Sequence, residues 1–143
     1  MLYFQPPSDF SPSFDVVACY ITCGSEILFI QRHEAKDHGR TWDLPGGKIN
    51  EGEYPLDAVV REVFEETGLI FEPKDFEFLK KVFVRLPECD FEHNVFQVKI
   101  PEKYRITLSP EEHTSFTWVT PLEALKMPLV PDEDQCIRYF FRL

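Results

Sequence analysis

Hydrophobic and polar positions along this chain follow two periods, one typical of β-strands and one typical of α-helices. Two runs rich in β-branched and aromatic residues, Phe14 to Thr22 and Glu26 to Gln31, are separated by Gly24-Ser25. Such a short break between strand-like runs predicts a hairpin, with which the sheet begins. Three later segments are also predicted to be strands: Phe76 to Val84, Asn94 to Ile100, and Ser115 to Val119.

The clearest helical pattern begins at Pro55 and stops at Gly68. Proline suits the first position of a helix, and glycine suits its C-terminal end. Apolar residues recur along this segment at the spacing i, i+3, i+4, i+7, namely Leu56, Val59, Val60 and Val63. Glu62, Glu65 and Glu66 share a second stripe, about a third of a turn away. We therefore expect an amphipathic helix that packs by one stripe and presents carboxylates on its flank.

Loops and two further helices complete the pattern. His33 to Arg40 is polar and charged, as expected of a loop, and the Pro-Gly-Gly sequence at 45–47 predicts a sharp turn. Residues 120–123 have the form of a capping box with proline at the first helical position, so a short helix is expected from Pro121. Asp132 to Arg142 carries apolar residues at helical spacing and predicts a C-terminal helix that covers the sheet.

Length and composition indicate one globular domain. The 143 residues are 43% hydrophobic, enough to bury most of the apolar surface that the unfolded chain would expose. Residues 14–143 are expected to form this domain, without an internal repeat or a linker. Residues 1–13 are rich in proline and serine and are expected to form a flexible N-terminal arm, in which Leu2-Tyr3-Phe4-Gln5 resembles the remnant of a protease-cleavable tag.

The charge balance argues against long anionic partners. Fifteen basic and 25 acidic side chains give a net charge of −10, which repels the phosphates of nucleic acids and of anionic membranes. A small phosphate ester is compatible with this charge, because a divalent cation held by acidic side chains would invert the local potential. No stretch approaches the roughly 20 apolar residues needed to cross a bilayer, and no signal peptide is recognisable. We expect a cytoplasmic protein.

The four cysteines give no sign of a disulfide framework or a zinc site. Cys19, Cys23, Cys89 and Cys136 include no Cys-x-x-Cys pair. Cys19 and Cys23 are four residues apart in a predicted strand, so they face the same side. Since free cysteine is often buried, these residues are expected to be reduced thiols in the core.

The glutamates of the first predicted helix are the main candidates for chemistry. Carboxylates at i, i+3 and i+4 repel one another, which weakens the helix unless a cation compensates. Mg²⁺ suits such a site because it takes oxygen ligands and shares them with water and substrate phosphates, and Mn²⁺ could replace it. A solvated acidic helix face would account for isolated glutamates. Arg61, Glu53 and the Gly46-Gly47 backbone, which can approach a cation closely, favour the metal site instead.

These residues fall into one pattern, Gly-x5-Glu-x7-Arg-Glu-Val-x-Glu-Glu-x-Gly-Leu, which runs from Gly47 to Leu69. The pattern resembles the signature of the Nudix hydrolases at every fixed position. The resemblance implies an α/β fold, an α/β/α sandwich whose mixed β-sheet holds the signature as a loop, a helix and a loop. It also implies a nucleotide pyrophosphohydrolase, an acid anhydride hydrolase that cleaves a nucleoside diphosphate linked to another group.

The same resemblance implies roles for individual residues. Four residues would hold the metal ions: Glu62, Glu65 and Glu66 by their carboxylates and Gly46 by its carbonyl. Arg61 and Glu53 would keep these glutamates in place.

A general base is needed to take the proton of the attacking water. Glu62 is the first candidate and Glu112 its rival, because family members often place one further glutamate, metal-binding or proton-accepting, in a loop like residues 109–112. Glu111 competes with Glu112 for that position. His113 is expected to pack or to cap rather than to catalyse, since a lone loop histidine indicates little.

Flanking similarity to the MutT-like branch of the family covers residues 30–33, 44–49 and 112–119. It implies that Arg32 and Lys48 contact substrate phosphates, as long cationic side chains do. Each of them could equally be an ordinary surface cation. Recognition of a base would need an aromatic platform and a polar group at the base edge, for which Asp132 or Glu133 is the candidate.

The expected reaction is the Mg²⁺-dependent hydrolysis of a small nucleotide, an ordinary or oxidised nucleoside triphosphate, to a nucleoside monophosphate and pyrophosphate. ADP-ribose, nucleotide sugars and dinucleoside polyphosphates are the alternatives, because the shared motif handles only the diphosphate. A nucleotide-binding regulatory module without catalysis is an alternative of another class, which the complete glutamate set disfavours. Removal of pyrophosphate from RNA 5′ ends is disfavoured by the acidic balance. The sequence leaves the oligomeric state open.

Overall fold

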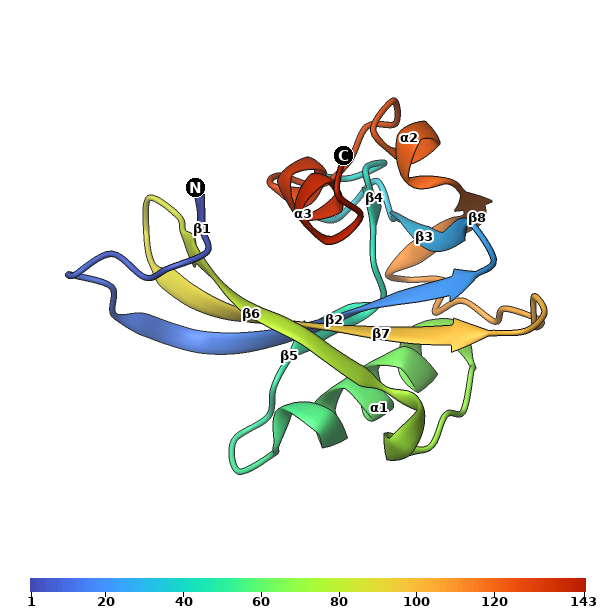
Figure 1. Cartoon of the computed structure of the whole chain (residues 1–143), viewed down its shortest axis with the longest axis horizontal. Coiled ribbons are helices and arrows are strands. Elements are labelled where there is room, and N and C mark those ends of the chain that lie inside the picture. The colour runs from blue at the N-terminus through green and yellow to red at the C-terminus, as the bar shows by residue number, and fades with distance from the viewer.

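A mixed β-sheet forms the centre of the computed structural model, which describes residues 1–143, and helices lie on both of its faces (Figure 1). The strands are β1 (Leu2–Tyr3), β2 (Pro12–Cys23), β3 (Glu26–Arg32), β4 (Trp42–Asp43), β5 (Gly46–Lys48), β6 (Glu77–Arg85), β7 (Asp90–Ile100) and β8 (His113–Val119). The helices are α1 (Pro55–Thr67), the 3₁₀ turn η1 (Pro73–Asp75), α2 (Pro121–Ala124) and α3 (Glu133–Phe140). The expected α/β fold with a mixed sheet is confirmed.

The strand order is β1-β6-β7-β2-β3-β4, with β5 paired to β2 and β8 paired to β3. Strands β2 and β7 run parallel, whereas every other strand pair is antiparallel. Along one edge, β2 pairs with β5 at Val16 to Ala18 and with β3 only at Thr22 and Cys23. The sheet therefore divides between these two pairings, and β3, β4 and β8 diverge from the rest.

Every strand and helix predicted from the sequence is present, and the structure adds β1, β4, β5 and the 3₁₀ turn η1. Strand β5 lies where a sharp turn was expected. It carries two glycines and no apolar alternation, so its strand conformation comes from pairing with β2. A Cβ on Gly46 would lie 2.1 Å from the Val17 carbonyl oxygen, which only glycine avoids. A two- or three-residue strand without a period of its own has no signal in the sequence.

Helix α1 begins at Pro55 and ends at Gly68, which adopts the left-handed conformation with φ 77°. Its buried face differs from the predicted stripe, because Leu56 is exposed and Glu66 is buried. Burial of Glu66 is tolerated because the Gly46 N–H donates a hydrogen bond to its carboxylate. The buried positions of α1 are Ala58, Val59, Val63, Glu66 and Thr67.

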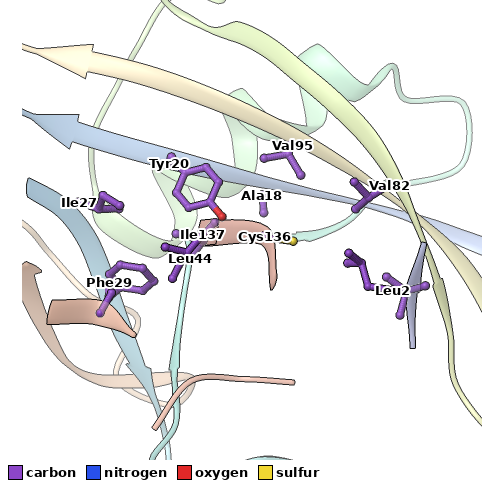
Figure 2. Packing of buried hydrophobic residues seen from close by; sticks show 12 residues of the cluster. Leu2, Ala18, Tyr20, Ile27, Phe29, Leu44, Val82, Val95, Cys136 and Ile137 are labelled. Atoms are coloured by element: carbon purple, nitrogen blue, oxygen red, sulfur yellow. The ribbon is translucent and has the colours of Figure 1, made fainter. Parts of the chain in front are cut away.

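Two hydrophobic cores lie on opposite faces of the sheet. One core joins the sheet to α1 through Val59 and Val63. The other joins it to α3, and Figure 2 shows Tyr20 and Val95 of the sheet near Ile137 and Cys136 of that helix. The helices on the two sides are separated by the sheet in Figure 1.

All four cysteines are free, as expected. Cys19 and Cys136 are buried, and Cys19 and Cys23 lie on the α1 side of β2. Cys23 and Cys89 are only partly buried, so the expectation that all four lie in the core is wrong for these two.

The N-terminal segment, expected to form a flexible arm, lies against the domain. Leu2 and Tyr3 form β1, which pairs with Val84 and Phe83 of β6, and the side chain of Leu2 is buried. Strand β2 begins at Pro12, still within the segment expected to be an arm. Among the helices, none has the length and apolar composition that a membrane crossing requires.

Candidate active site

Arg61, in the middle of α1, contacts three carboxylates. Its Nε donates a hydrogen bond of 2.9 Å to Oε2 of Glu53, and its Nη2 donates one of 2.9 Å to Oε1 of the same carboxylate. Its Nη1 donates to Glu62 at 2.8 Å and to Glu65 at 3.2 Å. Hydrogen bonds from Arg61 lower the pKa of Glu53 to about 2, so this carboxylate stays ionised near neutral pH. Arg61 thus contacts Glu53, Glu62 and Glu65, and the holding role of Arg61 and Glu53 stays a prediction.

Glu66 is the most buried carboxylate of the signature. Its side chain accepts a 2.8 Å hydrogen bond from the N–H of Gly46, in β5. Burial, and to a lesser extent the nearby Glu62, Asp43 and Glu112, raises the pKa of Glu66 to about 9. A negative charge at this position lacks a compensating partner within the protein, and a bound cation would supply one.

Glu112, just before β8, and His113, its first residue, meet Glu66 at the C-terminal part of α1. One ligand atom from each of the three residues lies within 4.8 Å of the others. The Nδ1 of His113 is 3.7 Å from the nearer Glu66 oxygen, is buried, and has no hydrogen-bond partner. The side chain of His113 is buried, as its sequence context predicted. Packing alone does not explain why its buried Nδ1 has no hydrogen-bond partner.

Glu62 and Glu65 both contact Arg61. The carboxylate of Glu62 lies against Gly47, where a Cβ would be 2.6 Å from it. Burial raises the pKa of Glu62. Glu65 is about half exposed, and its carboxylate contacts Arg61.

The predicted metal ligands are thus distributed between two adjacent groups. Glu66 forms one group with Glu112 and His113, whereas Glu62 and Glu65 share Arg61. Gly46 donates its N–H to Glu66, and the metal-binding role of its carbonyl stays a prediction. A buried carboxylate, further carboxylates beside it and an unpartnered imidazole nitrogen together fit a divalent cation.

A cavity of about 330 Å³ reaches Gly46 and Gly47, the two glycines that contact Glu66 and Glu62. Strands β2, β6 and β7 contribute Ala18, Val84 and Phe91 to its lining, and the start of α3 contributes Glu133. On the side of the signature the cavity is lined by Arg32, Asp43, Gly46 and Gly47. The cavity therefore connects the face of the sheet covered by α3 with the two glycines that contact Glu62 and Glu66.

Acidic side chains supply much of the polarity of the cavity. Burial raises the pKa of Asp43 to about 6, although Arg32 lies 3.8 Å away. Burial likewise raises the pKa of Glu133 to about 8, and its carboxylate accepts a 2.7 Å hydrogen bond from the Tyr20 hydroxyl. Asp132, proposed for base recognition, also lines the cavity. Asp43 was not predicted as a site residue, and its only signal in the sequence was its place two residues before the Pro-Gly-Gly sequence.

The two cations predicted to contact phosphates differ in position. Arg32 lines the cavity, and its Nε donates a 2.7 Å hydrogen bond to the Asp37 carbonyl. Lys48 does not line it, and its Nζ lies 4.4 Å from the centre of the Phe14 ring. Arg32 is therefore already placed beside the cavity, whereas Lys48 would have to leave the aromatic ring to reach a ligand there.

Comparison with known proteins decides the family. The sequence matches the NUDIX domain over residues 12–140. The chain belongs to the Nudix family. As a Nudix hydrolase it is an acid anhydride hydrolase, a pyrophosphohydrolase of nucleotide substrates, and its carboxylate signature is complete.

Relatives of this Nudix hydrolase cover nearly its whole length. The CTP pyrophosphohydrolase of Escherichia coli (strain K12) is 30% identical over 131 residues, which cover 90% of this chain and 92% of that protein. The MutT protein from Methanosarcina mazei Go1 is 29% identical with a TM-score of 0.79, and the match covers 92% of this chain and 95% of that chain. The E. coli ORF135 protein is 26% identical with a TM-score of 0.73, covering 97% and 95%. The resemblance to the MutT-like branch is confirmed.

Proposed function

We propose that this enzyme hydrolyses a nucleoside triphosphate, ordinary or oxidised, to a nucleoside monophosphate and pyrophosphate in the presence of Mg²⁺. The observation that carries the proposal is the position of the cavity against Gly46 and Gly47. The N–H of Gly46 binds Glu66, and the backbone of Gly47 contacts Glu62. A nucleoside in the cavity would direct its phosphates past these glycines to the carboxylates.

The size and chemistry of the cavity support recognition of one nucleoside. Its volume of about 330 Å³ lies within the range of small-molecule sites. Carboxylate oxygens of Asp132 and Glu133 could accept hydrogen bonds from the amino group of a base, while Phe91 offers an aromatic face. The similarity to a CTP pyrophosphohydrolase supports a nucleoside triphosphate as the substrate.

The carboxylates carry the chemistry in this proposal. Mg²⁺, or Mn²⁺ in its place, would be held by Glu62, Glu65, Glu66 and the Gly46 carbonyl and would neutralise charge that develops on the phosphate oxygens. Arg61 and Glu53 hold the glutamates, and Arg32 and Lys48 contact the phosphates. Glu62, or else Glu112, accepts the proton of the water that attacks phosphorus as the anhydride bond breaks.

The same proposal assigns the partners and the compartment. The enzyme acts on small nucleotides in the cytoplasm, and its net charge of −10 disfavours long nucleic acids and anionic membranes.

A hydrolysis screen with Mg²⁺ tests the substrate. The panel comprises ordinary and oxidised nucleoside triphosphates, ADP-ribose, nucleotide sugars and diadenosine polyphosphates. Pyrophosphate and a nucleoside monophosphate from a triphosphate are the expected products, and the position of ¹⁸O from labelled water identifies the phosphorus that is attacked. Faster cleavage of ADP-ribose, a nucleotide sugar or a diadenosine polyphosphate would identify that compound, rather than a nucleoside triphosphate, as the substrate. Tight binding without any product would indicate a regulatory module.

A further inference from the structure

We infer that the imidazole of His113 is a ligand of the divalent cation bound at Glu66, so that this site combines one nitrogen with its oxygens. The inference deepens the proposed function and rests on it, because it requires that a divalent cation binds at Glu66. It adds a residue that lies outside the glutamate signature and that the sequence suggested only as a packing or capping group.

The position of His113 supports this role. It is the first residue of β8, and its side chain is 5% exposed. Its Nδ1 is buried without a hydrogen-bond partner, which is uncommon for a buried polar atom in a native fold. That nitrogen faces Glu66 at 3.7 Å, a separation too long for a hydrogen bond. The Nδ1 of His113 thus lies beside the Glu66 carboxylate without forming a hydrogen bond with it.

The spacing of the three groups suits a shared ion. Ligands about 2.1 Å from an octahedral ion are about 3 Å apart when adjacent and about 4.2 Å apart when opposite. The 3.7 Å between His113 Nδ1 and Glu66 lies between these values, and Glu112 completes a group whose ligand atoms all lie within 4.8 Å. Small side-chain rotations would bring all three ligands to one ion.

A nitrogen ligand has a consequence for metal preference. Mg²⁺ favours oxygen ligands, whereas imidazole suits transition metals. We therefore expect His113 to strengthen the binding of Mn²⁺ more than that of Mg²⁺. The His113→Asn variant should bind Mn²⁺ at least about tenfold more weakly, while its affinity for Mg²⁺ should change by less than about threefold.

The decisive experiment is pulsed electron paramagnetic resonance of the full chain with one equivalent of Mn²⁺, which detects a ¹⁴N nucleus of a bound imidazole. Calorimetric titrations with Mn²⁺ and Mg²⁺ accompany it. The matched control is His33→Asn, because the His33 N–H donates to the Glu112 carbonyl while its own Nδ1 is already occupied by the Ala35 N–H. This histidine is therefore adjacent to Glu112 through its backbone, but its Nδ1 is engaged and it does not belong to the group of ligands around Glu66.

An imidazole signal in the wild type and in His33→Asn, lost in His113→Asn with Mn²⁺ still bound, would support the inference. Bound Mn²⁺ without an imidazole signal in the wild type would overturn it and leave the proposed function intact. A signal that persists in His113→Asn would also overturn it. Should His113→Asn fail to fold, His113→Gln is measured in its place. If the wild type bound no Mn²⁺ at millimolar concentration, the proposed function would fail as well.

Discussion

The carboxylate of Glu62 lies directly against the backbone of Gly47, so that a Cβ at position 47 would stand 2.6 Å from it. The two residues belong to the strand and the helix of the signature, and their contact shows why glycine precedes the acidic helix. The atoms that a Cβ would meet belong to the end of a flexible side chain. A larger residue at position 47 would therefore displace the carboxylate rather than the backbone.

Gly47→Ala should consequently reduce turnover more than stability. We expect kcat with Mg²⁺ to fall at least about tenfold, since a small displacement of a catalytic group is costly. Thermal unfolding should shift by only a few degrees. Gly24→Ala is the control. Gly24 has a positive φ of 59° and no atoms within 4 Å of the added Cβ, so this substitution strains the backbone without displacing another side chain. Wild-type turnover in Gly47→Ala would show that the position of Glu62 is unimportant.

Glu66→Gln should separate stability from function. The buried carboxylate is desolvated, and a neutral amide can still accept the Gly46 hydrogen bond through its oxygen. In the presence of EDTA we expect the free energy of unfolding to rise by on the order of 1 kcal/mol. Turnover with Mg²⁺ should fall at least about a hundredfold, as it should in Glu62→Gln. Glu51→Gln, in the exposed loop before α1, is the control. Near-normal rates in both Glu62→Gln and Glu66→Gln would refute the metal and base assignments.

Arg61→Lys should lower activity although the charge is conserved. Lysine cannot reproduce the paired hydrogen bonds to Glu53 while also reaching Glu62 and Glu65. We expect kcat/KM to fall between about tenfold and a hundredfold. If Glu53 acts through Arg61, the double variant with Glu53→Gln should be no worse than Arg61→Lys alone. If the double variant instead lost activity by the product of the two single losses, Glu53 would have a role independent of Arg61.

Glu133→Gln should change how stability depends on pH. Burial raises the pKa of the Glu133 carboxyl from 4.5 to about 8 in the folded state. The contribution of this carboxyl to stability is fully present below about pH 4.5 and is lost as pH rises towards and through 8, because in this range the unfolded state has already released the proton that the folded state still binds. The amide stays neutral throughout. The free energy of unfolding of Glu133→Gln should therefore exceed that of the wild type by a margin that grows to on the order of 1–3 kcal/mol at pH 8.

Denaturant titrations between pH 5 and 8 measure this margin. The neighbouring Asp134→Asn is the control, since the side chain of Asp134 is exposed and is also in the first turn of α3. A constant difference between Glu133→Gln and the wild type across this range would mean that the carboxyl is not protonated in the fold.

The sequence determined the elements that have a period of their own. Strand β2, helix α1 and helix α3 follow from alternating or helical spacing, because side-chain direction along a strand or helix is fixed locally. The signature from Gly47 to Leu69 determined the family, since its residues are close along the chain and their spacing sets which of them share a helix face. Arg61 and Glu53 were both expected beside the glutamates for this reason, whereas their hydrogen bond to each other appears only in the structure.

Tertiary structure alone decided how distant parts of the chain meet at the site. Strand β8 brings His113 to Glu66, and β5 presents the Gly46 N–H to the same carboxylate. The cavity likewise exists only because α3 covers one face of a sheet that divides beside β2. The burial of Glu133 and Glu66 also depends on these contacts. No local spacing encodes them, because desolvation is set by everything that packs around a group, and the sequence fixes only its neighbours along the chain.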